Sequence, residues 1–62
     1  MLTGRERQVL GLLADGCTYE KIACRLGVSL HTITTHIKNA YRKLEVHSGP
    51  AAVMRAVRLG LL

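Results

Sequence analysis

The sequence contains no tryptophan and no phenylalanine, and it has only one proline and two cysteines among its 62 residues. Apart from two tyrosines, a hydrophobic core has to be built from leucine, isoleucine, valine, alanine and methionine. Two cysteines are too few for a disulfide scaffold. Cys17 and Cys24 also lie seven positions apart, which differs from the Cys-x₂₋₄-Cys spacing of zinc sites. We therefore expect neither a metal nor any other cofactor.

Acidic residues and long apolar runs are also scarce. Nine Lys and Arg against four Asp and Glu give a formal net charge of +5, which in so short a chain favours a polyanionic partner such as nucleic acid or an anionic membrane surface. No apolar run approaches the roughly 20 residues that span a bilayer, and the N-terminus lacks the pattern of a signal peptide. We expect one cytoplasmic domain over residues 1–62. Without paired carboxylates or a nucleophile–base pair, an enzyme is not expected.

Turn-forming and capping residues divide the chain into four helices. Thr3 and Glu6 have the spacing of a capping box, in which each side chain pairs with a backbone N–H of the other at a helix start. Thr and Ser begin further helices, Gly ends them, and Pro suits a first turn. These boundary residues are Gly16, Thr18, Gly27, Ser29 and Pro50. The sequence predicts an all-α, compact four-helix domain, with Pro50 at the first position of a helix that ends near Leu59.

Residues 30–37, LHTITTHI, favour a strand on local propensity, because threonine and isoleucine are stiff at χ1. A strand should alternate apolar and polar residues, however, and Thr35 breaks that alternation between the two isoleucines. In a helix over 29–44, the apolar residues share one face at about 100° per residue. They are Ile33, Ile37, Ala40, Tyr41 and Leu44. The opposite face is polar and basic, and consists of His31, Thr34, Thr35, Lys38 and Arg42.

Two helices joined by a short glycine-containing turn, with the second helix amphipathic, form a helix-turn-helix. In DNA-binding proteins, this second helix lies in the major groove with its N-terminal residues at base edges. Threonine suits that place, because its hydroxyl can donate or accept a hydrogen bond and its methyl can contact thymine. The alternative is a polar face that is merely solvated. The net charge and the turn favour the DNA-binding interpretation.

Three stretches of the chain together resemble the LuxR-type (NarL/FixJ-like) helix-turn-helix domain, which stands at the C-terminus of many bacterial transcription factors. They are LTGRERQVLGLLADG (2–16), IACRLGVSLHTITTHIKNAYRKLEV (22–46) and AVMRAVRLGLL (52–62). Each stretch is modest alone, but their order and spacing are very specific. The resemblance implies the output domain of a transcription regulator, which binds two half-sites of double-stranded DNA as a homodimer.

The sequence departs from the family pattern at three places. Thr34 stands where the family usually has Lys or Arg, so one long cationic side chain is missing from the recognition helix. Gly49 occupies a loop position that is often basic. Glu20 and Lys21 invert the usual Lys-Glu order at the start of the second helix, which removes a second capping box.

The resemblance assigns the DNA contacts to the helix-turn-helix. Base edges or their flanking phosphates would be contacted by Thr34, Thr35 and Lys38. Phosphates or sugars would be contacted by Ser29, His31, Thr32 and Arg42. The second helix would bring Thr18, Tyr19 and Lys21 to the DNA backbone. Three alternatives stay open: Ser29 and Thr18 serve only as N-caps, Tyr19 is a half-exposed packing residue, and Lys21 is an ordinary surface charge.

The predicted helix over 50–60 carries more apolar surface than one core needs. One apolar stripe continues the core and consists of Ala52, Val53, Ala56 and Leu59. A second stripe consists of Met54, Val57 and Leu61, and an exposed apolar stripe on so small a domain suggests a partner. The resemblance implies that this helix is the dimer contact. Packing of Met54 and Val57 against the first helix is the alternative.

We therefore predict a sequence-specific DNA-binding domain of a bacterial regulator, with double-stranded DNA and a second copy of the chain as partners. RNA polymerase is a further candidate partner. Within the same class, the promoter-binding region 4 of sigma factors is the alternative. From a different class, the alternative is a basic protein-interaction module that binds an acidic partner without reading DNA sequence. Dependence of binding on DNA sequence separates these two classes.

Overall fold

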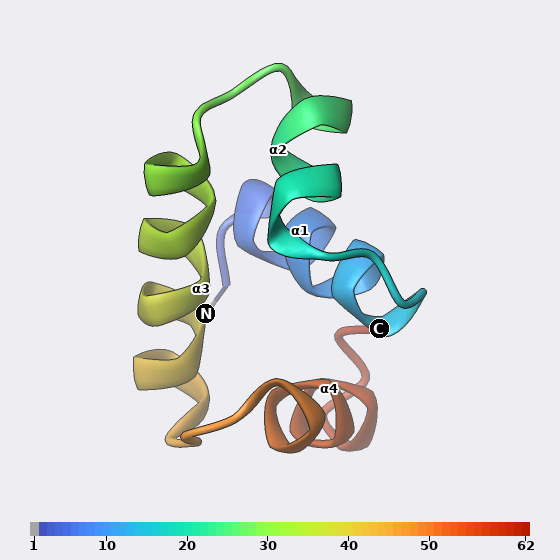
Figure 1. The fold of residues 1–62 in the computed structure, drawn as a ribbon. Helices are drawn as coiled ribbons and strands as arrows, with labels where there is room; N and C mark the ends of the chain where they lie inside the picture. Colours follow the sequence, from blue (N-terminus) through green and yellow to red (C-terminus); the bar gives the residue numbers. More distant parts are fainter. Residues whose placement is uncertain (1) are drawn as a thin grey trace.

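Four helices account for most of residues 2–62, the part of the chain that the computed structural model describes, and no strand is present in that part. They are α1 (Gly4–Ala14), α2 (Tyr19–Leu26), α3 (Leu30–Leu44) and α4 (Gly49–Arg58). The long helix α3 runs along one side of the molecule, with α2 beside its N-terminal half and α4 crossing near its C-terminal end (Figure 1). Helix α1 packs against each of the other three helices. The predicted all-α, four-helix fold is confirmed.

Side-chain caps start every helix, because the first backbone N–H groups of a helix have no partner within it. The capping box of α1 is complete: the Glu6 backbone N–H donates to Thr3 Oγ1 at 3.1 Å, and the Thr3 backbone N–H donates to Glu6 Oε1 at 3.0 Å. Thr18 and Ser29 cap α2 and α3 as predicted. Helix α4 begins at Gly49 with Ser48 as N-cap. Pro50 is therefore one position later than predicted, still in the first turn where a missing N–H costs little.

The hydrophobic core has two adjoining parts that share α3. The part between α1, α3 and α4 contains Leu2, Leu10, Ala40, Leu44, Val46, Ala52 and Ala56. The part between α1, α2 and α3 contains Val9, Ile22, Ala23, Ile33 and Ile37. The predicted apolar face of α3 is thus buried along its whole length, apart from Tyr41, which is half-buried. Because the apolar face of α3 is buried in both parts of the core, the opposite face of α3 points to solvent.

One charged side chain lies inside this core. Glu6 is 3% exposed, and its Oε1 accepts a hydrogen bond at 2.8 Å from Lys43 Nζ on α3. Burial alone would raise the pKa of Glu6, but the hydrogen bonds from Lys43 and from the Thr3 backbone outweigh it and hold the pKa below its ordinary value. Sequence reasoning found the capping role of Glu6 and missed this ion pair, which joins residues 37 positions apart.

The C-terminal end of α3 is closed by two features. Glu45 follows the helix in the left-handed conformation, with φ 57°. From α4, Arg55 Nη1 donates a hydrogen bond at 3.2 Å to the Leu44 carbonyl, one of the acceptors that the end of a helix leaves unpaired. Within residues 2–62, no helix has both the length and the apolar character needed to cross a membrane.

Candidate DNA-binding interface

The turn between α2 and α3 sets the angle between these two helices. Gly27 ends α2 in the left-handed conformation with φ 68°. A Cβ at this position would meet no atom within 4 Å, so the glycine is needed for its backbone conformation and not for space. Two residues later, Ser29 caps α3 by accepting a hydrogen bond from the Thr32 N–H at 3.1 Å. The structure therefore has the predicted helix-turn-helix, with the turn at one end of the molecule (Figure 1).

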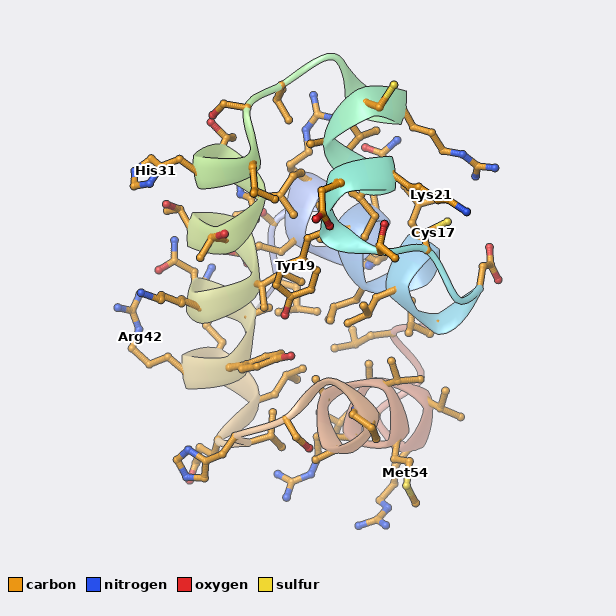
Figure 2. The ribbon with its side chains drawn as sticks, viewed as in Figure 1. Cys17, Tyr19, Lys21, His31, Arg42 and Met54 are labelled. Atoms are coloured by element: carbon orange, nitrogen blue, oxygen red, sulfur yellow. The ribbon has the colours of Figure 1, made fainter. Side chains whose placement is uncertain are left out.

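A row of exposed polar side chains follows the outer face of α3. His31, Thr35, Lys38 and Arg42 are all exposed, and their spacing places them along one side of the helix. Figure 2 shows His31 and Arg42 pointing away from the other three helices. We call these four residues the outer row. Lys38 and Arg42 make this row basic, and it brings together four of the predicted DNA-contact residues.

The hydrogen bonds of Thr34 and Thr35 explain how β-branched residues are accommodated near the start of this helix. Thr34 Oγ1 donates a hydrogen bond at 3.0 Å to the Leu30 carbonyl, and Thr35 Oγ1 donates one at 3.1 Å to the His31 carbonyl. Such bonds to the preceding turn are the usual way in which a helical threonine satisfies its hydroxyl. Thr35 is exposed, whereas Thr34 is half-buried on the flank of α3 that also carries Tyr41.

The residues at the two helix starts have well-defined local roles. Thr18 Oγ1 accepts a hydrogen bond from the Lys21 N–H at 3.2 Å, and the hydroxyls of Ser29 and Thr32 lie 2.9 Å apart. Thr18 and Ser29 are nevertheless exposed. Capping and a contact to a DNA phosphate are therefore compatible at both places. The Lys21 side chain lies on the side of α2 remote from the outer row in Figure 2.

The side chain of Tyr19 is not fully exposed to solvent. It is half-buried, and its side chain reaches from α2 toward α3 (Figure 2). Its hydroxyl lies 3.5 Å from the hydroxyl of Tyr41. Burial, together with this hydrogen bond to Tyr19, raises the pKa of Tyr41 to about 12, so Tyr41 stays neutral at physiological pH. The sequence placed Tyr41 on the apolar face and gave no signal of the hydroxyl contact, which links the two helices of the motif.

The outer side of α4 is apolar, with one correction to the prediction. Met54 and Val57 are 64% and 57% exposed, so most of the surface of both side chains is open to solvent. Leu59, predicted in the core stripe, is 48% exposed, because α4 ends at Arg58 and Leu59 follows as its C-cap. That prediction was wrong. Leu61 is half-buried against the core and is therefore less available to a partner than Met54 and Val57.

An apolar pocket of about 560 Å³ lies between the end of α1 and the start of α4. Leu13, Cys17, Pro50 and Met54 are among the residues that line it. Within residues 2–62, no group of three or more His, Cys, Asp and Glu side chains is placed to hold a metal ion. Exposed cationic side chains are found on all four helices.

Known proteins with the same features identify the family. The profile described as "Bacterial regulatory proteins, luxR family" matches residues 1–56. The chain is 45% identical over 60 residues to the uncharacterized response regulatory protein YgeK of Escherichia coli (strain K12), an alignment that covers 97% of this chain and 41% of YgeK. The chain belongs to the luxR family of bacterial regulatory proteins, and its fold is the helix-turn-helix domain of that family.

Solved structures agree with this assignment. The transcription factor GerE superposes with a TM-score of 0.93 at 38% sequence identity, covering 98% of this chain and 91% of GerE. The response regulator ChrA of a heme-sensing two-component system superposes with a TM-score of 0.97 at 32% identity, covering 100% of this chain and 31% of ChrA. The chain thus spans about a third to two fifths of the response regulators it matches, and nearly all of GerE. The family is a class of DNA-binding regulator domains and not a class of enzymes.

Proposed function

We propose that the chain binds double-stranded DNA sequence-specifically, as the output domain of a bacterial transcription regulator, with α3 in the major groove. The observation that carries this proposal is the outer row of α3: exposed, polar and basic side chains on the second helix of a helix-turn-helix. The buried Ile and Leu side chains of the same helix fix its orientation. A DNA-binding regulator of this family acts in the bacterial cytoplasm, on the nucleoid.

Within this proposal, Lys38 is the strongest single contact. It is exposed in the middle of the outer row, and it stands one turn beyond Thr34, where the family usually supplies a second long cation. His31 and Arg42, at the two ends of the row, reach phosphates or sugars on either side, and Ser29, Thr32, Thr18 and Tyr19 contact the DNA backbone near the helix starts. Lys38→Ala should weaken binding to the preferred site by about 1–3 kcal/mol and change the base preferred at one position.

We further propose that two copies meet through α4 on DNA. Met54 and Val57 lie three positions apart and are both largely exposed, so they share one face of the helix. A single short helix buries much less than the roughly 1,200 Å² of a stable interface, so the free domain is monomeric or weakly dimeric. Two half-sites about 10 base pairs apart would bring the copies together. Leu61 contributes at the edge of this contact, and RNA polymerase is a candidate further partner.

The test is a selection of preferred sites from a library of random duplexes, followed by binding titrations with the selected duplex and a scrambled duplex of equal composition. The proposal predicts a preferred sequence, tighter binding to it, and loss of that preference in Lys38→Ala. A basic protein-interaction module would show a similar fall of binding with salt but equal affinity for both duplexes. Equal affinity would therefore contradict the proposal.

A further inference from the structure

The hydroxyl protons of Thr34 and Thr35 are already used by the helix that carries them. Each hydroxyl lies within hydrogen-bond distance of a carbonyl oxygen four residues earlier, at 3.0 Å for Thr34 and 3.1 Å for Thr35. A carbonyl can only accept, so each hydroxyl must be the donor. Toward the surface, each threonine therefore offers the lone pairs of its oxygen and its methyl group, but no proton.

Base pairs in the major groove differ in what they offer to such a side chain. An A·T pair presents the amino group of adenine N6 as a donor and the C5 methyl of thymine as an apolar surface. A G·C pair likewise presents one amino donor, at cytosine N4, and two acceptors, guanine N7 and O6 in place of adenine N7 and thymine O4, but it has no methyl group. A threonine without a proton to donate can accept from either amino group and can give nothing to the acceptors of either pair. The thymine methyl is therefore the feature that favours A·T for such a side chain.

We propose that Thr34 and Thr35 select A·T base pairs where the first turns of α3 face the DNA. Each does so by accepting a hydrogen bond from adenine and by placing its methyl against the thymine methyl. The proposal rests on the proposed function, since it requires α3 to lie in the major groove. Thr35 belongs to the exposed outer row, and Thr34 is still accessible in part on the adjoining flank.

The same geometry assigns guanine recognition elsewhere on the helix. A Lys or Arg at position 34 would donate to guanine N7 and O6, which is the commonest specific contact of long cations. With threonine there, Lys38 is the nearest cationic side chain of the outer row that can do so. For Thr34 or Thr35 to contact guanine as a donor, the hydroxyl would have to give up its bond to the helix. The preferred half-site should therefore contain an A·T step beside a position read by Lys38.

A thymine-to-uracil scan of the selected duplex tests the proposal, because uracil lacks only the C5 methyl. With the unmodified chain, replacement of one or two particular thymines should weaken binding roughly threefold to fourfold, the effect expected for one methyl contact. Thr34→Ser and Thr35→Ser keep the hydroxyl and remove the methyl. Each should weaken binding to the thymine duplex by a similar factor and should no longer respond to uracil at its own position.

Thr3→Ser is the matched control, because it removes the same methyl group from a threonine outside the helix-turn-helix, and serine keeps the N-cap of α1. Its uracil scan should match that of the unmodified chain. A circular dichroism melt of each variant checks the fold. Thr35→Val complements the set, since it keeps the shape and removes the oxygen. It should retain the uracil effect and become insensitive to replacement of the facing adenine by purine, which lacks the N6 amino group.

The outcomes separate this proposal from the one on which it rests. A preferred site with guanine opposite Thr34 and Thr35, or a uracil scan that is flat for the unmodified chain, would overturn the assignment of A·T while sequence-specific binding stands. A library that yields no preferred site at all would overturn both. A uracil effect that disappears in Thr34→Ser or Thr35→Ser, and persists in Thr3→Ser, supports the proposal.

Discussion

Replacing Lys43 by methionine tests how much the ion pair between α3 and α1 contributes to stability, since it joins Lys43 to the buried Glu6. Methionine keeps most of the apolar stem and removes the charge. The Glu6 side chain is 4% exposed and the Lys43 side chain 30%. Without the ammonium group, the Thr3 backbone N–H at 3.0 Å is the hydrogen-bond donor that remains to Glu6 Oε1 among the described residues. The variant therefore leaves a buried carboxylate with one of its two hydrogen-bond donors.

The expected loss follows from these exposures. Removing one partner of a fully buried ion pair costs about 3–5 kcal/mol, because the other charge stays buried. Lys43 is partly in water, which lowers the value of the pair, so we expect about 2–3 kcal/mol. A 62-residue domain has a free energy of unfolding of roughly 3–9 kcal/mol. The substitution should consequently remove a large part of the total stability.

The pH dependence gives the prediction a sign. In the unmodified chain the pKa of Glu6 lies below its ordinary value of 4.5, so this contribution to stability is complete above pH 4.5 and is lost as the pH falls through the lowered pKa. In Lys43→Met, burial still raises the pKa of Glu6, the hydrogen bonds from Thr3 still lower it, and the two contributions of Lys43 that lower it are gone. The pKa of Glu6 should therefore be higher in the variant, and acidification from pH 7 toward pH 4 should destabilise the variant less than the unmodified chain.

Urea unfolding followed by circular dichroism, at pH 7 and at several values down to pH 4, measures both effects. Lys38→Met is the matched control, since it makes the same substitution at an exposed position of the same helix and should change stability by less than about 0.5 kcal/mol. Adding Glu6→Gln to Lys43→Met removes the buried charge and should recover part of the loss. Equal stability of the two methionine variants, with the same response to acid, would refute the reasoning.

The remaining predictions concern the DNA interface and the dimer. Thr34→Lys should strengthen DNA binding and steepen the dependence of log K on log salt by about 0.9, the value for one added phosphate contact; titrations at several salt concentrations measure it, and an unchanged slope and affinity would mean that residue 34 does not face DNA. Met54→Lys combined with Val57→Glu should weaken binding to a duplex with two half-sites and leave binding to one half-site unchanged, with a circular dichroism melt as the folding control; equal behaviour of variant and parent on both duplexes would contradict dimerisation through α4. Tyr41→Phe should lower stability by about 0.5–1.5 kcal/mol through loss of the hydroxyl pair, and Tyr19→Phe should do the same. The DNA affinities of the two variants are then compared at a temperature where both are folded. If Tyr19 contacts a phosphate, Tyr19→Phe should bind DNA more weakly than Tyr41→Phe. Equal affinities of the two variants would assign Tyr19 to packing alone.

Sequence patterns predicted those parts of the fold that depend on neighbouring residues. The capping box at Thr3 and Glu6, the N-caps Thr18 and Ser29, and the left-handed Gly27 are all determined within one helical turn. The apolar face of α3 overrode the strand preference of its threonines, because burial of a whole helix face outweighs local propensity. The structure adds that the hydroxyls of Thr34 and Thr35 donate hydrogen bonds to carbonyls of the same helix. Two residues with low helix propensity therefore leave no hydroxyl proton without an acceptor.

Features that depend on distant residues could not be read from the sequence. The Glu6–Lys43 pair and the Tyr19–Tyr41 contact join residues 37 and 22 positions apart, and helical periodicity says nothing about which side chains meet across a helix pair. Leu59 was misplaced because the apolar spacing continued past the point where α4 ends. The predicted recognition residues lie on the helix-turn-helix, but which of them touch DNA is a property of the complex.

The central claim, that the outer row of α3 contacts DNA and reads its sequence, is tested most directly by an NMR titration of the isotope-labelled chain with the selected duplex and with its scrambled control. With the selected duplex, the account predicts the largest changes in amide and side-chain signals at His31, Thr35, Lys38 and Arg42, and smaller, uniform changes with the scrambled duplex. The largest changes at Arg55 and Arg58 of α4, with the outer row unaffected, would contradict it.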